Sequence, residues 1–318
     1  MKVMVTGATG FIGSALASTL ATSPDYSVCS SSRRPAPHAG AEHHVIGTLD
    51  ADTRWSKALH GVAVVVHCAA RVHVMNETTK DPLAEYRRIN VDGTLNLARQ
   101  AAQAGVKRFI FLSSIKVNGE ASKDGSPFTA QDLPAPSDPY SISKWEAEEA
   151  LRVLAQATGM EVVIIRPVLV YGPGVKGNFS SMMGWLNRGI PLPLGSIHNK
   201  RSLLALDNLV HLIVTTITHP AAANQVFLVS DGEDISTTSL LRQMAAALNK
   251  PPRLVPVPAS LLEYTAAILG KRAVAQRLCT SLQVDITHTR ETLAWKPPVA
   301  LTEGLQSAAD AFLRTKEQ

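Results

Sequence analysis

The sequence predicts an α/β fold, a doubly wound parallel sheet with a smaller C-terminal lobe. Segments typical of strands and of helices alternate through the first half of the 318 residues, as in repeated strand–helix units. The run VAVVVH at 62–67 is apolar and β-branched throughout, which is typical of a strand buried on both faces. After Arg166 glycine and proline become frequent, which indicates a second region of short elements.

The alternating elements can be placed in order along the chain. Apolar runs predict strands at 2–6, 27–31, 62–67, 108–113, 162–165 and 225–229. Helical apolar spacing predicts helices at 11–20, 83–104, 140–158 and 203–217, the last being amphipathic. For the helix at 140–158, Ser137 or Asp138 can cap the first turn, Pro139 suits the start, and Gly159 suits the end.

Composition excludes several classes of protein. Hydrophobic residues make up 45% and charged residues 18%, so the chain is neither disordered nor fibrous. The net charge is +5, but Lys and Arg are scattered, so no nucleic-acid partner is expected, although a cleft for an anionic small molecule remains compatible. There is no uninterrupted apolar stretch of about 18 residues, and no signal peptide is recognised, so we expect no membrane span.

Cysteine and histidine usage argues against disulfides and metal sites. Cys29, Cys68 and Cys279 are odd in number and far apart, and no cluster with metal-ligand spacing surrounds them. A reducing cytoplasm is the expected location. We expect His67 to be a core residue, and neither His67 nor His73 to bind a metal.

A glycine-rich loop lies where the first strand turns into the first helix. The residues are TGATGFIG at 6–13, and Gly7, Gly10 and Gly13 would allow a tight turn and a close approach to a pyrophosphate. The helix that starts at Phe11 and Ile12 would offer its free N–H groups to the phosphates. This context predicts a Rossmann-type dinucleotide site, the alternative being an ordinary glycine-rich turn.

The end of the second strand bears on the choice of cofactor. An acidic residue there would bind the adenosine ribose of NAD, whereas an arginine would suit the 2′-phosphate of NADP. The sequence has SSSRR at 30–34 and no acid. Ser32 and Arg33 therefore favour NADP(H), with NAD(H) as the alternative, unless Arg33 is only part of a solvated basic turn.

A tyrosine and a lysine stand four residues apart in YSISK at 140–144. That spacing places Tyr140 and Lys144 on one face of a helix. A tyrosine, with an ordinary pKa of about 10, needs nearby positive charge to exchange a proton near neutral pH, and the Lys144 ammonium can supply it. Ser114, which follows the strand at 108–113, could orient a reacting carbonyl or hydroxyl group.

At this point the motifs resemble those of a known family. The glycine loop, HCAAR at 67–71, RINVDGTLNL at 88–97, LSSIKVNGE at 112–120, YSISK, and RPVLVYGPG at 166–174 occur in the same order. The set is similar to the extended short-chain dehydrogenases/reductases that act on nucleotide sugars, over essentially the whole chain. The resemblance implies a dinucleotide-binding domain at 1–170 plus about 202–230, and a substrate lobe at 171–201 and 231–318.

The resemblance also implies roles for individual residues. The catalytic set would be Ser114, Tyr140 and Lys144, with Tyr140 and Lys144 also touching the cofactor. Further cofactor contacts carried over by position are the glycine loop with Gly7, Gly10, Phe11, Ile12 and Gly13, then Asp50 at the adenine, Ala69, Ala70, Arg71, Asn90, which is often structural, and Pro167 at the nicotinamide. Substrate contacts would come from Ser114, Lys116, Asn178, Arg201 and Arg277, although Lys116 and the two arginines are also compatible with solvated surface positions.

Two departures from the family pattern are informative. The family's dehydratases carry an Asp-Glu pair directly after the catalytic hydroxyl residue, but Ile115 and Lys116 stand here, so dehydration is not expected. Asn118 replaces a tyrosine that is usual at its position.

The leading functional hypothesis is reduction of a 4-keto nucleotide sugar, a UDP-N-acetylated deoxyhexose, in surface-polysaccharide (O-antigen) precursor synthesis. In this respect the chain resembles bacterial reductases that make UDP-N-acetylquinovosamine. The alternative is a UDP-hexose or UDP-N-acetylhexosamine 4-epimerase with tightly bound NAD, and a third hypothesis is a non-catalytic dinucleotide sensor. By the same resemblance, a homodimer would form through the helices near 83–104 and 140–158.

Overall fold

The computed structural model describes residues 1–35, 42–72, 79, 81–123, 125–268, 270 and 272–317, so that His73 lies outside the described residues. Ten strands are assigned within these ranges: β1 Lys2–Thr6, β2 Ser27–Ser32, β3 Glu42–Val45, β4 Val64–His67, β5 Arg108–Leu112, β6 Glu161–Pro167, β7 Leu169–Tyr171, β8 Arg201–Ala205, β9 Val226–Val229 and β10 Asp234–Ile235. The α-helices are α1 Phe11–Ala21, α2 Pro82–Arg87, α3 Thr94–Gln103, α4 Pro139–Thr158, α5 Asn178–Asn187, α6 Leu206–Thr218, α7 Thr237–Ala247, α8 Ala259–Ile268, α9 Arg272–Cys279, α10 Thr287–Leu293 and α11 Leu301–Glu317.

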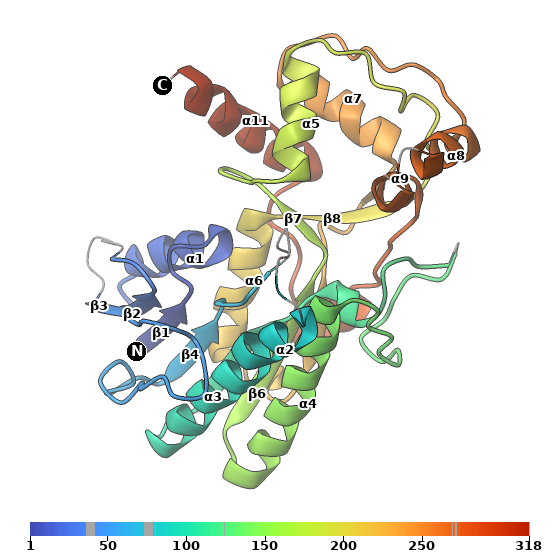
Figure 1. Ribbon diagram of the computed structural model, residues 1–318. Coiled ribbons are helices and arrows are strands. Elements are labelled where there is room, and N and C mark those ends of the chain that lie inside the picture. The colour runs from blue at the N-terminus through green and yellow to red at the C-terminus, as the bar shows by residue number, and fades with distance from the viewer. Residues whose placement is uncertain are drawn as a thin grey trace.

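A seven-stranded parallel sheet forms the main body, in the order β3-β2-β1-β4-β5-β6-β9. Helices α1 and α6 cover one face, while α2, α3 and α4 lie side by side on the other (Figure 1). This confirms the Rossmann-type doubly wound fold. The chain leaves β1 in one direction toward β2 and β3 and later in the other toward β4 and β5. In such sheets ligands bind outside the carboxyl ends of the strands at this reversal, here at the ends of β1 and β4.

A second hydrophobic core supports the remainder of the chain. The three-stranded sheet β10-β8-β7 and the helices α5, α7 and α11 surround it, away from the main sheet (Figure 1). Tyr171, Met183, Leu241 and Leu305 are among its fully buried members. The segment 282–295 packs instead into the core of the main sheet, through side chains that include Leu282, Val284, Ile286 and Trp295.

The predicted helix at 203–217 starts three residues late in the structure. Residues 203–205 belong to strand β8, and the helix α6 begins at Leu206. Leu204 packs into the core of the main sheet, whereas Leu203 and Ala205 pack into the second core. Both faces of this short strand are therefore apolar, and an apolar run of that kind cannot be told from a buried helix by periodicity.

The predicted helix at 83–104 is not one regular α-helix. A π-helical segment, Arg88–Gly93, joins α2 to α3 and places Asn90 in the interior. Such segments occur frequently at functional sites. The end of the helix agrees with expectation, because Gly105 adopts a positive φ of 80° directly after it.

Among the described residues, no helix is long and apolar enough to cross a membrane.

Candidate active site

The glycine loop packs directly against the chain that follows β4. Gly7 has a φ of +68°, and a Cβ there would lie 2.9 Å from the backbone of Ala69. A Cβ at Gly13 would lie 2.3 Å from the carbonyl oxygen of Gly7. Helix α1 begins beside this turn, and its capping residue Gly10 provides no side-chain hydrogen bond. The first N–H groups of α1, at Phe11 and Ile12, thus have no side-chain cap, and an anionic group such as a pyrophosphate fits this cradle.

A buried histidine joins β1 to the helix layer. The Thr6 hydroxyl lies 2.7 Å from Nδ1 of His67, and the Thr94 hydroxyl lies 3.0 Å from its Nε2. The backbone N–H of Ala69 donates to the same Thr6 hydroxyl at 3.2 Å. Burial, with a smaller effect from Lys144, lowers the pKa of His67 to about 3, so the ring is neutral. The prediction that His67 is a core residue is confirmed.

Asn90 ties the strand ends to the catalytic helix. Its amide accepts a hydrogen bond from the backbone N–H of Arg71 at 2.8 Å and donates to the Arg71 carbonyl at 3.0 Å. It also donates to the hydroxyl of Ser143 in α4 at 3.0 Å. Asn90 therefore fixes the segment of Ala69, Ala70 and Arg71 relative to α4, which is a structural role.

Tyr140 and Lys144 lie in the first two turns of α4. The helix starts with a capping box, in which the Asp138 carboxylate accepts from the Ser141 N–H at 2.8 Å and the Ser141 hydroxyl accepts from the Asp138 N–H at 3.1 Å. Lys144 is 1% exposed, and its Nζ lies 3.9 Å from the ring centroid of Phe111. This ring comes from β5, the strand that leads to Ser114.

The Ser114 hydroxyl hydrogen-bonds to Tyr140, and Lys144 lies one helical turn beyond Tyr140 in α4. Burial raises the pKa of Tyr140 to about 12, the Asp138 charge adds to this, and the Ser114 hydroxyl acts in the opposite direction. Burial lowers the pKa of Lys144 to about 7, while Glu148 and Cys68 oppose this shift. The lysine can thus change its charge near neutral pH, and its charged form would favour ionisation of the tyrosine.

Asp50 lies beside a shallow hollow of about 300 Å³ between β3 and the following loop, which Ile46, Gly47 and Thr53 also line. Its carboxylate accepts from the Thr53 hydroxyl at 3.0 Å, and a hydrogen bond with Thr48 holds the pKa of Asp50 below its usual value.

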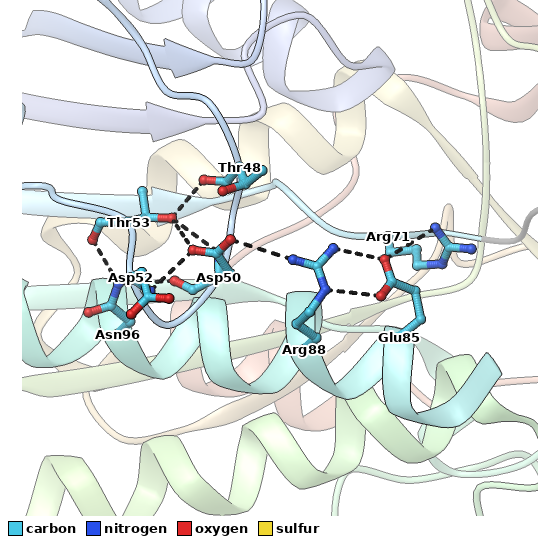
Figure 2. A network of polar contacts seen from close by, with 8 residues as sticks. All are labelled: Thr48, Asp50, Asp52, Thr53, Arg71, Glu85, Arg88 and Asn96. Carbon is cyan, nitrogen blue, oxygen red and sulfur yellow. Dashed lines mark hydrogen bonds and ion pairs between the residues drawn. The ribbon is translucent and has the colours of Figure 1, made fainter. Parts of the chain in front are cut away.

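Arg88 links this carboxylate to the end of the β4 segment. Figure 2 shows Arg88 between Asp50, at 3.5 Å, and Glu85, at 2.8 Å, with Arg71 3.9 Å beyond Glu85. Two of the predicted cofactor contacts, Asp50 and Arg71, therefore belong to one ionic network.

The end of β2 holds the two residues predicted to choose the cofactor. Ser32 is buried, and its hydroxyl donates to the Arg34 carbonyl and lies 3.3 Å from Nε2 of His43. Arg33 is exposed. The strand end lies next to the glycine loop, because the Ala8 N–H donates to the Ser31 carbonyl at 3.2 Å. Arg33 is thus placed at the expected edge, whereas the Ser32 hydroxyl is already engaged.

The predicted substrate residues fall into two groups. Arg201 donates from its guanidinium to the backbone carbonyl of Arg277 at 2.7 Å, which brings β8 and α9 together. Lys116 is ion-paired with Asp138 at 2.5 Å and with Glu120 at 3.1 Å.

Two other predicted positions stand at element boundaries. Asn178 is exposed and is the first residue of α5. Pro167 is buried at the end of β6.

Several residues of the site were not anticipated. Asp138 acts on both Tyr140 and Lys116, and Glu148 acts on Lys144. Glu148 stands four residues after Lys144, as Lys144 does after Tyr140, so the helical spacing that identified the pair could also have identified this carboxylate.

The structure also brings together Cys29, Glu42 and His44, side chains of the types that ligate metals. Cys29 and Glu42 are paired residues of the neighbouring parallel strands β2 and β3. The Lys2 ammonium lies 2.7 Å from the Glu42 carboxylate and supplies a counter-charge without a metal. Burial raises the pKa of Cys29 to about 11, which disfavours the thiolate that metals bind.

Comparison with known proteins agrees with this geometry. The model of the NAD dependent epimerase/dehydratase family matches residues 3–230. The chain belongs to this family. It is an enzyme of the extended short-chain dehydrogenase/reductase type, as its motifs indicated.

Individual relatives extend over the whole chain. A UDP-glucose 4-epimerase of Vibrio cholerae is 51% identical over 318 residues, which cover 100% of this chain and 97% of the relative. A GDP-6-deoxy-D-mannose reductase of Pseudomonas aeruginosa is 25% identical, and the match covers 100% of this chain and 99% of the relative. Among solved structures, MoeE5 in complex with UDP-glucose and NAD superposes with a TM-score of 0.79 at 27% identity, covering 99% of this chain and 100% of that one. This chain is thus similar to both epimerases and reductases of nucleotide sugars.

The glycine loop yields a test of the close approach to β4. Gly7 and Gly61 have nearly the same φ, +68° and +67°, but a Cβ at Gly61 would meet nothing within 4 Å. We expect Gly61→Ala to lower the free energy of unfolding by about 1–2 kcal/mol, the cost of a left-handed alanine. Gly7→Ala should cost clearly more in urea denaturation, because Ala69 must also move. Equal losses for the two variants would contradict the tight packing.

The side chain of Lys144 should have a pKa far below that of an ordinary lysine. In a ¹³C-lysine NMR titration of the protein without added ligands, we expect one side-chain resonance with a midpoint near pH 7. It should be missing from Lys144→Met. Because the unfolded chain binds this proton up to a pH of about 10, the free energy of unfolding should rise above pH 7, relative to Lys144→Met. If all lysine resonances titrate near pH 10, the conclusion that burial lowers the pKa of Lys144 is wrong.

Proposed function

We propose that this protein is a UDP-hexose 4-epimerase that uses a tightly bound NAD. The 51% identity with the Vibrio cholerae UDP-glucose 4-epimerase over the whole chain is the observation that carries this proposal. Two contacts support it: Ser114 hydrogen-bonds to Tyr140, and Lys144 lies near Cys68, whose backbone adjoins Gly7 of the glycine loop. A C4 epimerase needs an acid–base group next to a hydride carrier.

In the proposed mechanism Tyr140 moves the proton and the other two residues support it. Tyr140 takes the proton of the C4 hydroxyl, and the Lys144 ammonium stabilises the phenolate. Ser114 holds the reacting oxygen through a hydrogen bond. A nicotinamide cofactor held at the glycine loop and the start of α1 would supply the hydride acceptor for C4. Once the 4-keto sugar has rotated in the site, the hydride would return to the opposite face of C4, and Tyr140 gives the proton back to the C4 oxygen.

We assign the dinucleotide to the main sheet, residues 1–170 with about 202–230, and the sugar nucleotide to the second lobe. Arg201 and Arg277 are the proposed diphosphate contacts, because they lie together and arginine binds phosphate with charge-assisted hydrogen bonds. Asn178 is a further proposed contact. Lys116 is a contact only if it leaves Asp138 and Glu120 when substrate binds.

Reduction of a 4-keto nucleotide sugar, as in O-antigen precursor synthesis, is the second candidate function. The exposed Arg33 and the absence of an acid at 30–34 favour it, since they suit NADP(H) and a cofactor that is exchanged.

The assembly and location of the protein are proposals as well. We place it in the cytoplasm, in keeping with its three free cysteines. A homodimer would pair the helix layer of α3 and α4, where Val153 is 66% exposed.

Replacing Tyr140 tests the proposed activity. Tyr140→Phe keeps the ring and removes the acid–base group, so kcat for interconversion of UDP-glucose and UDP-galactose should fall by about 10²–10⁴-fold. Tyr86→Phe is the matched control, because its ring lies 6.1 Å from that of Tyr140 and its hydroxyl donates to the Val72 carbonyl. Similar turnover in the Tyr140 variant and the control would overturn the assignment.

The cofactor separates the two candidate functions. An epimerase should release about one NAD per chain on denaturation. A reductase should have an exchangeable site that takes up NADPH, with its affinity for NADPH reduced about tenfold or more in Arg33→Ala. Arg34→Ala serves as the control in fluorescence titrations. NADPH binding that depends on Arg33, with no NAD released, would replace the epimerase by the reductase.

A further inference from the structure

A buried ion pair lies behind the proposed catalytic residues. Glu148 of α4 is 0% exposed and Arg166 of β6 is 2% exposed. The guanidinium donates to both carboxylate oxygens, at 2.5 and 2.9 Å, and the hydroxyl of Ser113 donates to the same carboxylate at 2.5 Å. Arg152 of α4 also donates to this carboxylate, at 3.1 Å. The carboxylate is therefore held by two guanidinium groups and by the residue that follows β5.

The departure at Asn118 completes this network. The third donor of Arg166 reaches the Asn118 side-chain oxygen at 2.9 Å. The Asn118 amide in turn donates to the carbonyl of Thr129 at 3.0 Å. The asparagine, where a tyrosine is usual, thus serves as a hydrogen-bond acceptor for the buried guanidinium.

Each member of the network adjoins a residue assigned to the reaction. Ser113 precedes Ser114, Arg166 precedes Pro167, and Glu148 stands one helical turn beyond Lys144. A shift of the network would therefore move the hydroxyl, the strand end at the cofactor and the lysine together.

We propose that Glu148 is a positioning residue for the reaction: held by Arg166 and Ser113, it supplies the counter-charge that keeps Lys144 cationic beside Tyr140. This inference rests on the proposed roles of Tyr140 and Lys144.

Of the described groups that face Lys144, Glu148 is the one that carries a negative charge. From the end of β4 come His67, which is neutral because burial lowers its pKa to about 3, and the thiol of Cys68, whose pKa burial raises to about 12. From β5 comes the Phe111 ring, which carries no net charge. Among these neighbours only Glu148 brings a negative charge at neutral pH, and it is the first of the groups that raise the pKa of Lys144.

The charge of Glu148 decides which partner of the pair holds the proton. When the Tyr140–Lys144 pair loses one proton, either the tyrosine becomes a phenolate beside an ammonium or the lysine becomes neutral beside a phenol. Only the first form can act as the base. A negative charge that lies nearer to the lysine than to the tyrosine favours the form with a phenolate and an ammonium. Removing this charge favours the inactive form with a phenol and a neutral lysine.

The test compares Glu148→Gln with Glu146→Gln. Both remove one carboxylate from α4, but Glu146 is partly exposed and pairs with Arg87 at 2.6 Å on the surface. In the ¹³C-lysine titration without substrate, we expect the Lys144 midpoint to fall by about one pH unit in Glu148→Gln and to stay unchanged in the control. The pH profile of kcat should move to lower pH with a lower plateau, and Glu148→Asp should restore part of both.

A second variant keeps the test decisive if the single change prevents folding. Glu148→Gln combined with Arg166→Met removes the buried ion pair as a whole and leaves no unpaired guanidinium, so the fold should be retained. Its reference is Arg166→Met, in which Arg152 still pairs with Glu148, and the Lys144 midpoint should be lower in the double variant than in this reference. A folded Glu148→Gln variant, single or double, whose midpoint equals that of its reference overturns the role of Glu148. Because this readout needs no turnover, a shifted midpoint in a protein without epimerase or reductase activity would contradict the proposed function and not the electrostatic coupling.

Discussion

The site depends on keeping a positive charge inside a core. Lys144 is 1% exposed, and burial alone would leave it neutral at physiological pH. The aromatic face of Phe111 and the carboxylate of Glu148 oppose this tendency. Arg166 and Ser113 then hold the carboxylate in place. Helix α4, strand β5 and strand β6 therefore share one polar network within an otherwise apolar interior.

The glycine loop, whose shape fits a phosphate group, is connected to the region of Lys144 by two close contacts. The turn after β1 can touch the chain after β4 only because Gly7 lacks a side chain. Asn90 then fixes the same chain to α4, so that the helix terminus of α1 and the Tyr140–Lys144 pair share one framework. In the second lobe the Arg201 guanidinium of β8 donates to the backbone carbonyl of Arg277 in α9. In the proposed function, the phosphates of the ligand would lie at these two places and the reacting sugar beside the lysine.

Sequence patterns predicted the features that local chemistry controls. The cap of α4, predicted at Ser137 or Asp138 and found at Asp138, the end of α4 at Gly159 and the close packing of the glycine loop all follow from neighbouring residues. The strand at 203–205 was missed because two separate cores make both of its faces apolar. The ion pair of Lys116 with Asp138 and that of Glu148 with Arg166 join residues that are distant in sequence, so no local pattern shows them.

Following the hydrogen at C4 tests the central claim most directly. The protein should be incubated with UDP-glucose that carries deuterium at C4, and the sugar nucleotides analysed by mass spectrometry and NMR. Hydride transfer to a bound cofactor and back predicts UDP-galactose that retains the deuterium at C4, with no net consumption of NAD(H). Loss of the deuterium to solvent would show that C4 is deprotonated instead. That result, or UDP-glucose left unchanged by protein that holds NAD, would contradict the account.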